Sequence, residues 1–315
     1  MPRAGVDYPG TWQAFESWFP DDESCRQYLA RVRWRDGFSC PRCGGSETWL
    51  MTRGLWMCRA CGRQTSVTAG TIFHRSQYPL RVWFAAMWFV CAQKNGVSAL
   101  GLQRVLGFGS YETAWAWMHK LRRAMVRPDR DLLGGDGVAV EIDQTFIGGR
   151  TQGRSSARYA NKAEVAIAVE RQHPRGLGRV RLRHIDLEDR KGELFSFTQT
   201  CVAHGTIVYT DGDRAYRDIT RRLQLRHQPI VMISSPSPAH EVLPAVHQVA
   251  SLLKRWLAGT LHDGQSDTHL GYYLDEFTFR FNRRTSRSRG LLWYRLVQQA
   301  VLTDPHPYDV LTHKM

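Results

Sequence analysis

The sequence is short of acidic residues and lacks the long apolar run that a membrane span requires. Asp and Glu total 29 against 43 Lys and Arg, so the formal net charge is +14 over 315 residues. The longest apolar run, WFAAMWFVCA at 83–92, is about half as long as a bilayer-spanning helix. The opening residues, MPRAGVDYPGTW, hold no apolar segment typical of a secretory signal. We therefore expect a cytoplasmic protein that does not bind membranes and whose positive charge suits a polyanionic partner.

Cysteine is also sparse, because the chain has only seven. Four of them form two CxxC pairs separated by 14 residues, Cys40-Pro-Arg-Cys43 and Cys58-Arg-Ala-Cys61. In each pair, a tight turn lets two thiolates bind the same ion. Two such pairs supply the four thiolates of one closed, tetrahedral structural zinc site. The sequence therefore predicts a zinc ribbon. The three isolated cysteines are expected to be buried small apolar residues: Cys25, Cys91 and Cys201.

Basic and aromatic residues surround the predicted ribbon. They suit contact with nucleic acid: Arg42, Arg53, Arg59, Arg63, Trp49 and Trp56. A purely structural or protein-binding ribbon remains an alternative.

Three helical patterns follow the ribbon, and residues 97–125 resemble a helix-turn-helix. The third helix places one apolar stripe toward a core: Ala114, Trp117, Met118, Leu121 and Met125. Four basic or titratable residues lie off that stripe: His119, Lys120, Arg122 and Arg123. On an exposed helix such groups suit phosphate contacts or the major groove. The alternative is an ordinary helical bundle with a solvated basic face.

Beyond a Gly- and Asp-rich linker, strand-like and helix-like runs alternate, which predicts an α/β layer with a mixed sheet. Asp143 lies inside the apolar strand VAVEIDQTFIGG, where Asp is disfavoured. Asp211 ends a second apolar strand in GTIVYTDG. Taken alone, Asp143 is explained as a hydrogen-bonded structural residue, and Asp211 as a turn residue. Together, carboxylates on neighbouring strands can bind two divalent ions that hold the attacking and leaving oxygens of a phosphodiester in line.

A third ligand is expected from a helix packed on the sheet, and the helical pattern LPAVHQVASLLKRW at 243–256 offers one. Its buried stripe is predicted to be Leu243, Val246, Ala250, Leu253 and Leu257. His247 and Lys254 are seven residues apart and therefore stacked on an adjacent stripe. The imidazole can ligate a cation while the lysine holds a phosphate. A surface histidine beside a solvated lysine is the alternative.

The order of these features resembles a bacterial insertion-sequence transposase of the DDE superfamily. The motifs are the ribbon, VEIDQTFIGG, VYTDGDRAY, VHQVASLLKRWLAGT and YLDEFTFRFNRR, and they span about residues 20 to 295. The resemblance implies an RNase-H-like catalytic domain that uses Mg²⁺ or Mn²⁺ to cut DNA and transfer a 3′-OH. It also implies partners: terminal inverted repeats, target DNA, and further copies of the chain in a synaptic complex. It gives the site as Asp143, Asp211 and His247.

The superfamily's third acidic residue is usually Glu, with Lys or Arg seven positions later. Here His247 occupies that position and Lys254 keeps the spacing. An imidazole should favour Mn²⁺ over Mg²⁺, could act as a general base, or could mark an inactive copy. Other acids were weighed: Glu241, which has no basic residue seven positions on; Asp213, part of a turn; and Asp275 and Glu276, on a helix that resembles core.

The expected fold class is α/β, with an RNase-H-like mixed sheet and flanking helices, preceded by a zinc ribbon and a small helical domain. The expected domains are an N-terminal helical segment (1–36), the zinc ribbon (37–76), the helical domain (77–127), a linker (128–136), the catalytic domain (137–300) and a tail (301–315). Residues 150–158 and 282–290 are expected to be basic and mobile, the latter holding DNA backbone. The expected DNA contacts are Lys254, Arg255, Lys120, Arg122 and Arg123.

A nucleoid-associated transposase is the function that these patterns favour. Two rivals stay open: a DNA-binding regulator or inactive domesticated copy, and a structure-specific nuclease of the same fold.

Overall fold

The computed structural model divides the chain into two compact units. One unit is Met1–Arg127 with Thr285–Met315, and the other is Pro128–Arg284. The residues that the structure describes are 2–127, 130–135, 137–148, 162–172, 176–230, 242–261 and 267–312. Segment 150–158, residue Glu241 and part of the expected linker lie outside them.

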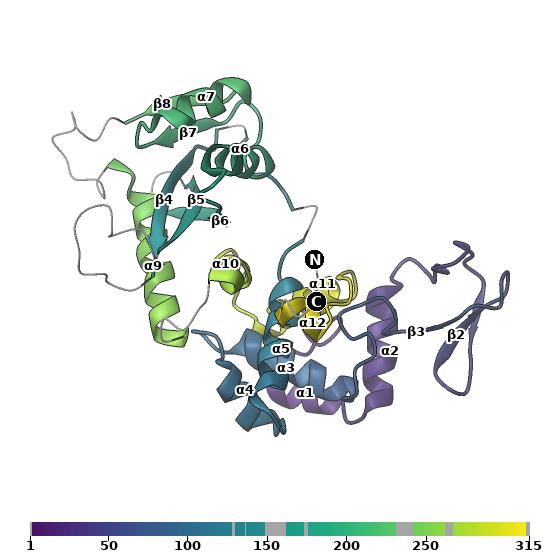
Figure 1. Ribbon diagram of the computed structural model, residues 1–315. Helices are drawn as coiled ribbons and strands as arrows, with labels where there is room; N and C mark the ends of the chain where they lie inside the picture. Colours follow the sequence, from purple (N-terminus) through teal and green to yellow (C-terminus); the bar gives the residue numbers. More distant parts are fainter. Residues whose placement is uncertain are drawn as a thin grey trace. The chain divides into compact units, whose positions relative to one another are not determined.

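The first unit combines helices with a small antiparallel sheet (Figure 1). Its helices are α1 (Trp12–Trp18), α2 (Asp22–Arg33), α3 (Leu80–Ala92), α4 (Ala99–Leu106), α5 (Tyr111–Arg123), α11 (Arg289–Ala300) and α12 (Tyr308–Thr312). Its strands are β1 (Thr48–Leu50), β2 (Leu55–Cys58) and β3 (Gln64–Ser66), in that order. Polar residues set several helix starts: Asp21 accepts from the Ser24 N–H, and Ser110 accepts from the Thr113 N–H.

Aromatic side chains fill the core of this unit. Phe15, Phe19, Phe84 and Trp293 are at most 1% exposed. Trp293 also donates its indole N–H to the Phe84 carbonyl at 3.0 Å, which satisfies the one polar group of a buried indole. Three helices far apart in the sequence, α1, α3 and α11, thus share one core.

Helix α11 therefore belongs to the first unit, whereas the sequence pattern placed it in the catalytic domain. The structural boundary falls after Arg284 and not at residue 300. An apolar helix pattern predicts burial but does not indicate which core receives the helix, and this helix returns to a core built 200 residues earlier.

The second unit is a five-stranded mixed sheet with helices on both faces (Figure 1). Its strands are β4 (Val140–Ile147), β5 (Ala163–Arg171), β6 (Leu177–Ile185), β7 (Ile207–Thr210) and β8 (Arg226–Pro229), in the order β6-β5-β4-β7-β8. Its helices are α6 (Arg190–Cys201), α7 (Arg214–Arg222), α9 (Pro244–Leu261) and α10 (Asp267–Phe281). β4 pairs antiparallel with β5 and parallel with β7. The expected α/β fold with a mixed sheet and flanking helices is confirmed.

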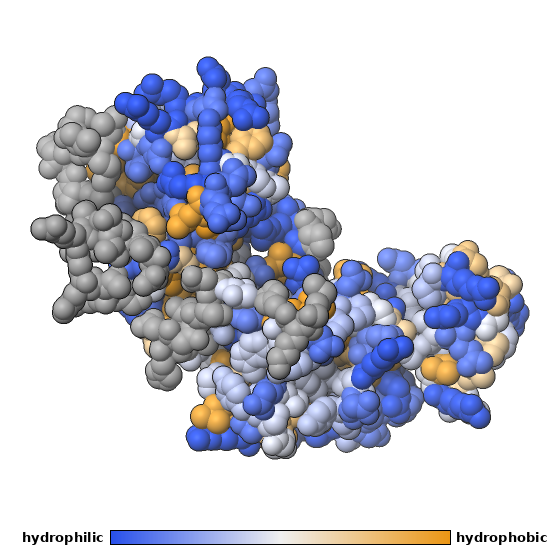
Figure 2. All heavy atoms as spheres, in the orientation of Figure 1, coloured by the Kyte–Doolittle hydropathy of each residue, from blue (hydrophilic) through white to orange (hydrophobic). Residues whose placement is uncertain are grey.

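Alternation along the strands separates two cores. In β5, Val165, Ile167 and Val169 face α9 and α10, while Ala166 and Ala168 face α6 and α7, as the two-residue period of a strand requires. The buried stripe predicted for α9 is confirmed, because all five of its residues are at most 7% exposed. On the face drawn in Figure 2, hydrophilic residues predominate and apolar residues form only scattered patches.

The basic run 282–290 differs from its prediction as a mobile segment. Asn282 bonds to both the N–H and the carbonyl of Val180 on β6, at 2.7 and 3.0 Å. Arg284 donates to the carbonyls of Gly178, Leu177 and Phe281. The first residues of the run therefore fix the end of α10 to an edge strand. Within the described part of the chain, no helix has the length and apolarity needed to cross a membrane.

We predict that Trp293→Ala lowers the free energy of unfolding of the first unit by about 3–5 kcal/mol, because it empties a buried aromatic site and leaves a carbonyl without its donor. Tryptophan fluorescence during guanidinium denaturation measures this, since every tryptophan except Trp256 lies in this unit. The control Trp49→Ala removes a 44% exposed ring and should change stability by less than about 0.5 kcal/mol. Equal effects of the two substitutions would contradict the assignment of α11 to this core.

Candidate functional site

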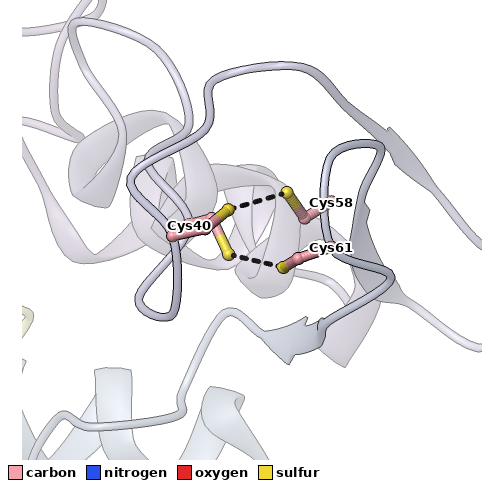
Figure 3. Close-up of side chains that lie close together, drawn as sticks. Cys40, Cys58 and Cys61 are labelled. Atoms are coloured by element: carbon pink, nitrogen blue, oxygen red, sulfur yellow. Dashed lines mark hydrogen bonds between the residues drawn. The ribbon is translucent and has the colours of Figure 1, made fainter.

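The four paired cysteines converge in the first unit. Their sulfur atoms all lie within 4.8 Å of one another, and Cys40–Cys61 and Cys43–Cys58 are each 3.6 Å apart (Figure 3). A tetrahedral ion with Zn–S bonds of about 2.3 Å places its sulfurs about 3.8 Å apart. The spacing therefore fits zinc without rearrangement, as the sequence predicted.

The two knuckles share one backbone conformation. Gly44 and Gly62 have φ of 72° and 67°, and their N–H groups bond to the carbonyls of Cys40 and Cys58. These turns need glycine because a side chain would be strained at such φ. The Arg42 backbone N–H lowers the pKa of the Cys40 thiol to about 6, whereas hydrogen bonds with Cys61 and Cys58 raise the pKa of Cys43 to about 12. The thiols therefore share protons, which zinc displaces when it binds.

The aromatic residues of the ribbon divide into two roles. Trp56 packs against Trp34 of α2 and against Phe38, with ring centroids 5.1 and 6.2 Å apart, so it fixes the ribbon to α2. Trp49 is 44% exposed, and the Arg59 guanidinium lies 6.0 Å from its ring. Of the two tryptophans predicted to face nucleic acid, only Trp49 is presented to solvent. The four predicted arginines of the ribbon are exposed.

The parallel pairing of β4 with β7 brings the two predicted aspartates together. Val140 is opposite Val208 and Glu141 is opposite Tyr209. Continued two residues beyond these pairs, the register brings Asp211, the residue after β7, beside Asp143, and the charge of Asp211 acts on that carboxyl. Asp143 points to the face that α9 covers, because it lies two residues from Glu141 on the same strand.

His247 lies on the first turn of α9, beside this pair. Its Nε2 atom is 3.9 Å from Asp143 Oδ2, and the side chains are 33% and 13% exposed. The structure therefore brings together a carboxylate on a central strand, a carboxylate at the end of the neighbouring strand, and an imidazole from a helix 36 residues further on.

Burial and neighbouring acids raise the pKa of Asp143 to about 6. Burial is the largest cause, and the charges of Asp211, Glu141 and Asp213 add to it, while a hydrogen bond from the Gln144 N–H opposes them. A crowded carboxylate of this kind gains from a bound cation. Carboxylates and imidazole are ligand types that Mg²⁺ or Mn²⁺ accepts, whereas among the described residues only the four cysteines have ligand atoms gathered closely enough to hold one ion.

On the opposite face of the sheet, a hydrogen-bonded network links β4, β5 and the turn that follows β7. Arg190 Nε donates to both oxygens of Glu164 at 3.0 Å. Its Nη2 donates to Gln144 at 3.3 Å and to Asp213 at 3.2 Å. The Gln144 amide donates in turn to the Tyr216 hydroxyl. Asp213 also caps α7 and donates its N–H to Asp211 Oδ1 at 3.0 Å, so the network fixes the turn that carries Asp211, and the prediction that Asp213 belongs to this turn is confirmed.

Sequence analysis did not identify this network or Glu141. Glu141 is 0% exposed, and its Oε2 atom accepts from the N–H groups of Ala245 and Val246 at 2.8 and 3.0 Å. The sequence feature that could have identified Glu141 is its position in an apolar run, two residues before Asp143. By contrast, Glu276 of α10 is buried against Arg280 at 2.8 Å, as expected of a core residue.

The predicted DNA-contacting residues differ in exposure. Lys254 and Arg255 are exposed on α9, and Arg123 is exposed at the end of α5. Arg122 is only 3% exposed and His119 is fully buried, so the prediction of an exposed basic face is wrong for these two positions. The C-terminal residues explain this: α12 packs on α5, and Gln299 of α11 bonds to the Ala124 carbonyl. The apolar stripe predicted for α5 is buried as expected.

Two family models match the chain. A transposase zinc-ribbon domain matches residues 20–64, and an ISXO2-like transposase domain matches residues 132–282. An uncharacterized protein in transposable element ISH50 of Halobacterium salinarum is 26% identical over 285 residues, which cover 83% of this chain and 91% of that protein. The match of the second domain ends within two residues of the structural boundary at Arg284.

We predict that Cys58→Ser abolishes binding of one zinc ion per chain, because a hydroxyl cannot replace the thiolate in a closed site. Zinc content measured by plasma mass spectrometry checks this. The matched control Cys201→Ala alters a buried cysteine of the second unit and should retain the zinc. Retention of zinc by Cys58→Ser would contradict the assignment.

We predict that Asp143→Asn stabilises the protein at pH 8 by roughly 2–3 kcal/mol when no Mg²⁺ or Mn²⁺ is added, and has no such effect near pH 4. The pKa of Asp143 in the folded state, about 6, exceeds the usual aspartate value of 3.8, so the folded state binds the proton more tightly. Wild-type stability therefore falls as pH rises through about 4 to 6, and the amide removes that loss. Calorimetry across this range is the measurement.

The control for this pH dependence is Asp186→Asn, at an exposed position, which should leave the profile unchanged. If Asp143→Asn is no more stable than wild type at pH 8, then burial and the neighbouring acids do not raise the pKa of Asp143 in the folded protein.

Proposed function

Because the chain belongs to the insertion-sequence transposases that join a transposase zinc ribbon to an ISXO2-like transposase domain, we propose that Asp143, Asp211 and His247 form its strand-transfer site. The observation that supports this proposal is the parallel β4–β7 pairing, which runs toward both aspartates, together with the 3.9 Å between His247 and Asp143.

The reaction has two in-line steps. Water attacks the phosphorus at the element's end, forming a P–O bond while the P–O3′ bond breaks and frees a 3′-OH. That hydroxyl then attacks a phosphodiester of target DNA, and the target's own P–O3′ bond breaks. Divalent ions bound here would activate the attacking oxygen and neutralise charge on the leaving oxygen.

Residues of this chain would bind the divalent ions and orient the reacting groups. Asp143 and Asp211 supply hard oxygen ligands, and the raised pKa of Asp143 supports a role in which a cation replaces its proton. His247 would supply an imidazole nitrogen, which favours Mn²⁺ over Mg²⁺ relative to a third carboxylate. A catalytic role for His247 as a general base is the alternative for the same position.

Lys254 would hold a phosphate close to this site. Burial and the charge of Lys162 lower the pKa of Lys254, so two cations crowd one another on this side of α9. A phosphate bound between them would relieve that repulsion. Arg255, on the same helix, would contact the DNA backbone beside it.

The ribbon and the end of α5 would bind the element's ends. The exposed arginines of the ribbon, Trp49 and Arg123 offer charge and one exposed ring, and such contacts position a protein on DNA more than they specify sequence. Lys120 would contribute less than Arg123, because its side chain is half-buried. Two ends must be cut and joined together, so the working form is a homo-oligomer on chromosomal DNA in the nucleoid.

We predict that the purified protein joins a labelled duplex of its own element end to a plasmid target in Mg²⁺ or Mn²⁺. Asp143→Asn, Asp211→Asn and His247→Ala should each reduce joining by at least about 100-fold, since each removes a group that touches the reacting phosphate's ions. The measurement is the yield of joined product on a sequencing gel.

The control is Asp275→Asn on α10, which should join normally. Gel-shift binding should persist in all three site variants. Binding with no cutting by wild type in either metal would refute the enzymatic proposal and leave a DNA-binding role. Undiminished joining by His247→Ala would remove His247 from the site.

A further inference from the structure

A buried carboxylate connects the two halves of the proposed site. Glu141 lies on central strand β4, two residues before Asp143 and on the same face. Its Oε2 atom accepts from the N–H groups of Ala245 and Val246 at the first turn of α9, and its Oε1 atom lies 3.3 Å from Arg171 Nε. A single side chain of the strand thus caps the helix that carries His247.

This arrangement needs an explanation beyond helix capping. Helices are usually capped by a residue next to them in sequence, but Glu141 is more than 100 residues from α9. Burying a carboxylate completely costs free energy unless charged and N–H partners surround it. Here the partners are the positive end of the α9 dipole and Arg171. Leu or Val at this position would fill the space without that cost.

The geometric consequence concerns His247. The N–H of Val246, the residue immediately before it, is fixed by Glu141, while Asp143 is only two strand residues, roughly 7 Å, from Glu141. The 3.9 Å approach of His247 to Asp143 therefore depends on where one carboxylate places the first turn of α9.

We propose that Glu141 is a positioning residue that sets the distance between His247 and the two aspartates. The proposal rests on the function proposed above for that trio. Glu141 acts through α9 and does not contact DNA. Its partner Arg171, whose guanidinium lies 4.8 Å from the Tyr209 ring on β7, extends the same support to the strand that precedes Asp211.

The first test measures position without any activity. Hydrogen exchange of the amides of Ala245 and Val246 is followed by NMR in the full-length zinc-loaded protein. In Glu141→Leu these amides should exchange about tenfold or more faster, because they lose a charged acceptor. In Glu141→Gln they should remain protected, since the side-chain carbonyl can still accept.

The second test measures the site. Mn²⁺ binding by electron paramagnetic resonance should weaken about 10- to 100-fold in Glu141→Leu and only a few-fold in Glu141→Gln, with joining rates following the same order. Asp143→Asn, which removes a proposed ligand, shows the Mn²⁺ binding and the joining rate expected when the site is lost.

The matched control is Glu170, another buried carboxylate, on the adjacent strand β5 but facing away from α9. It accepts from Gly134 and Arg179 and pairs with Arg179 at 2.6 Å. Glu170→Leu should lower stability comparably, yet leave the α9 amides and Mn²⁺ affinity unchanged. A merely structural role for Glu141 would make the two leucine variants alike.

Equal amide protection or equal Mn²⁺ affinity in Glu141→Leu and Glu170→Leu would overturn the proposal. If Glu141→Leu does not fold, Glu141→Gln against Glu170→Gln decides, since only the former should weaken Mn²⁺ binding. If wild type binds no Mn²⁺, the proposed function fails, whereas the exchange experiment still tests the positioning role.

Discussion

The parallel pairing of β4 with β7 is the constraint on which the proposed site depends. Parallel strands need a long crossover, and here the chain runs through β5, β6 and α6 before β7 returns beside β4. The register of that pairing alone decides whether Asp211 lies opposite Asp143. A shift of one residue would turn Asp211 to the other face, toward α6 and α7, where no imidazole of α9 could meet it.

Around that register the second unit buries several carboxylates, each with its own cationic or N–H partners. Glu164 meets Arg190, Glu170 meets Arg179, and Glu141 meets the α9 terminus and Arg171. Glu141 and Asp143, which both face α9, differ from Glu164 and Glu170, because burial raises the pKa of each and Glu141 Oε1 has no hydrogen-bond partner among the described residues. The fold thus pairs Glu164 and Glu170 with arginines and leaves two crowded carboxylates on the face that α9 covers. This contrast is typical of a cation-binding functional site.

The first unit is completed by residues from both ends of the chain. Helix α11 brings Trp293 into the aromatic core beside Phe15 and Phe84, and the residues after it cover α5. The exposed basic surface of the helical domain is therefore smaller than a pattern of off-stripe basic residues suggests. Arg123 at the helix end and the ribbon arginines remain exposed.

The zinc ligands and most of the helices and strands follow from local spacing in the sequence: CxxC turns and two-residue and 3.6-residue periods. The trio Asp143, Asp211 and His247 is a prediction that combines acids at apolar strands with the resemblance to DDE transposases. Only the tertiary structure decided that α11 joins the first core, that Arg122 is buried and that Asn282 and Arg284 fix α10 to β6. It also decided that Glu141 caps α9. These are contacts between segments as much as about 280 residues apart, and a local pattern that predicts burial carries no information about which distant segment provides it.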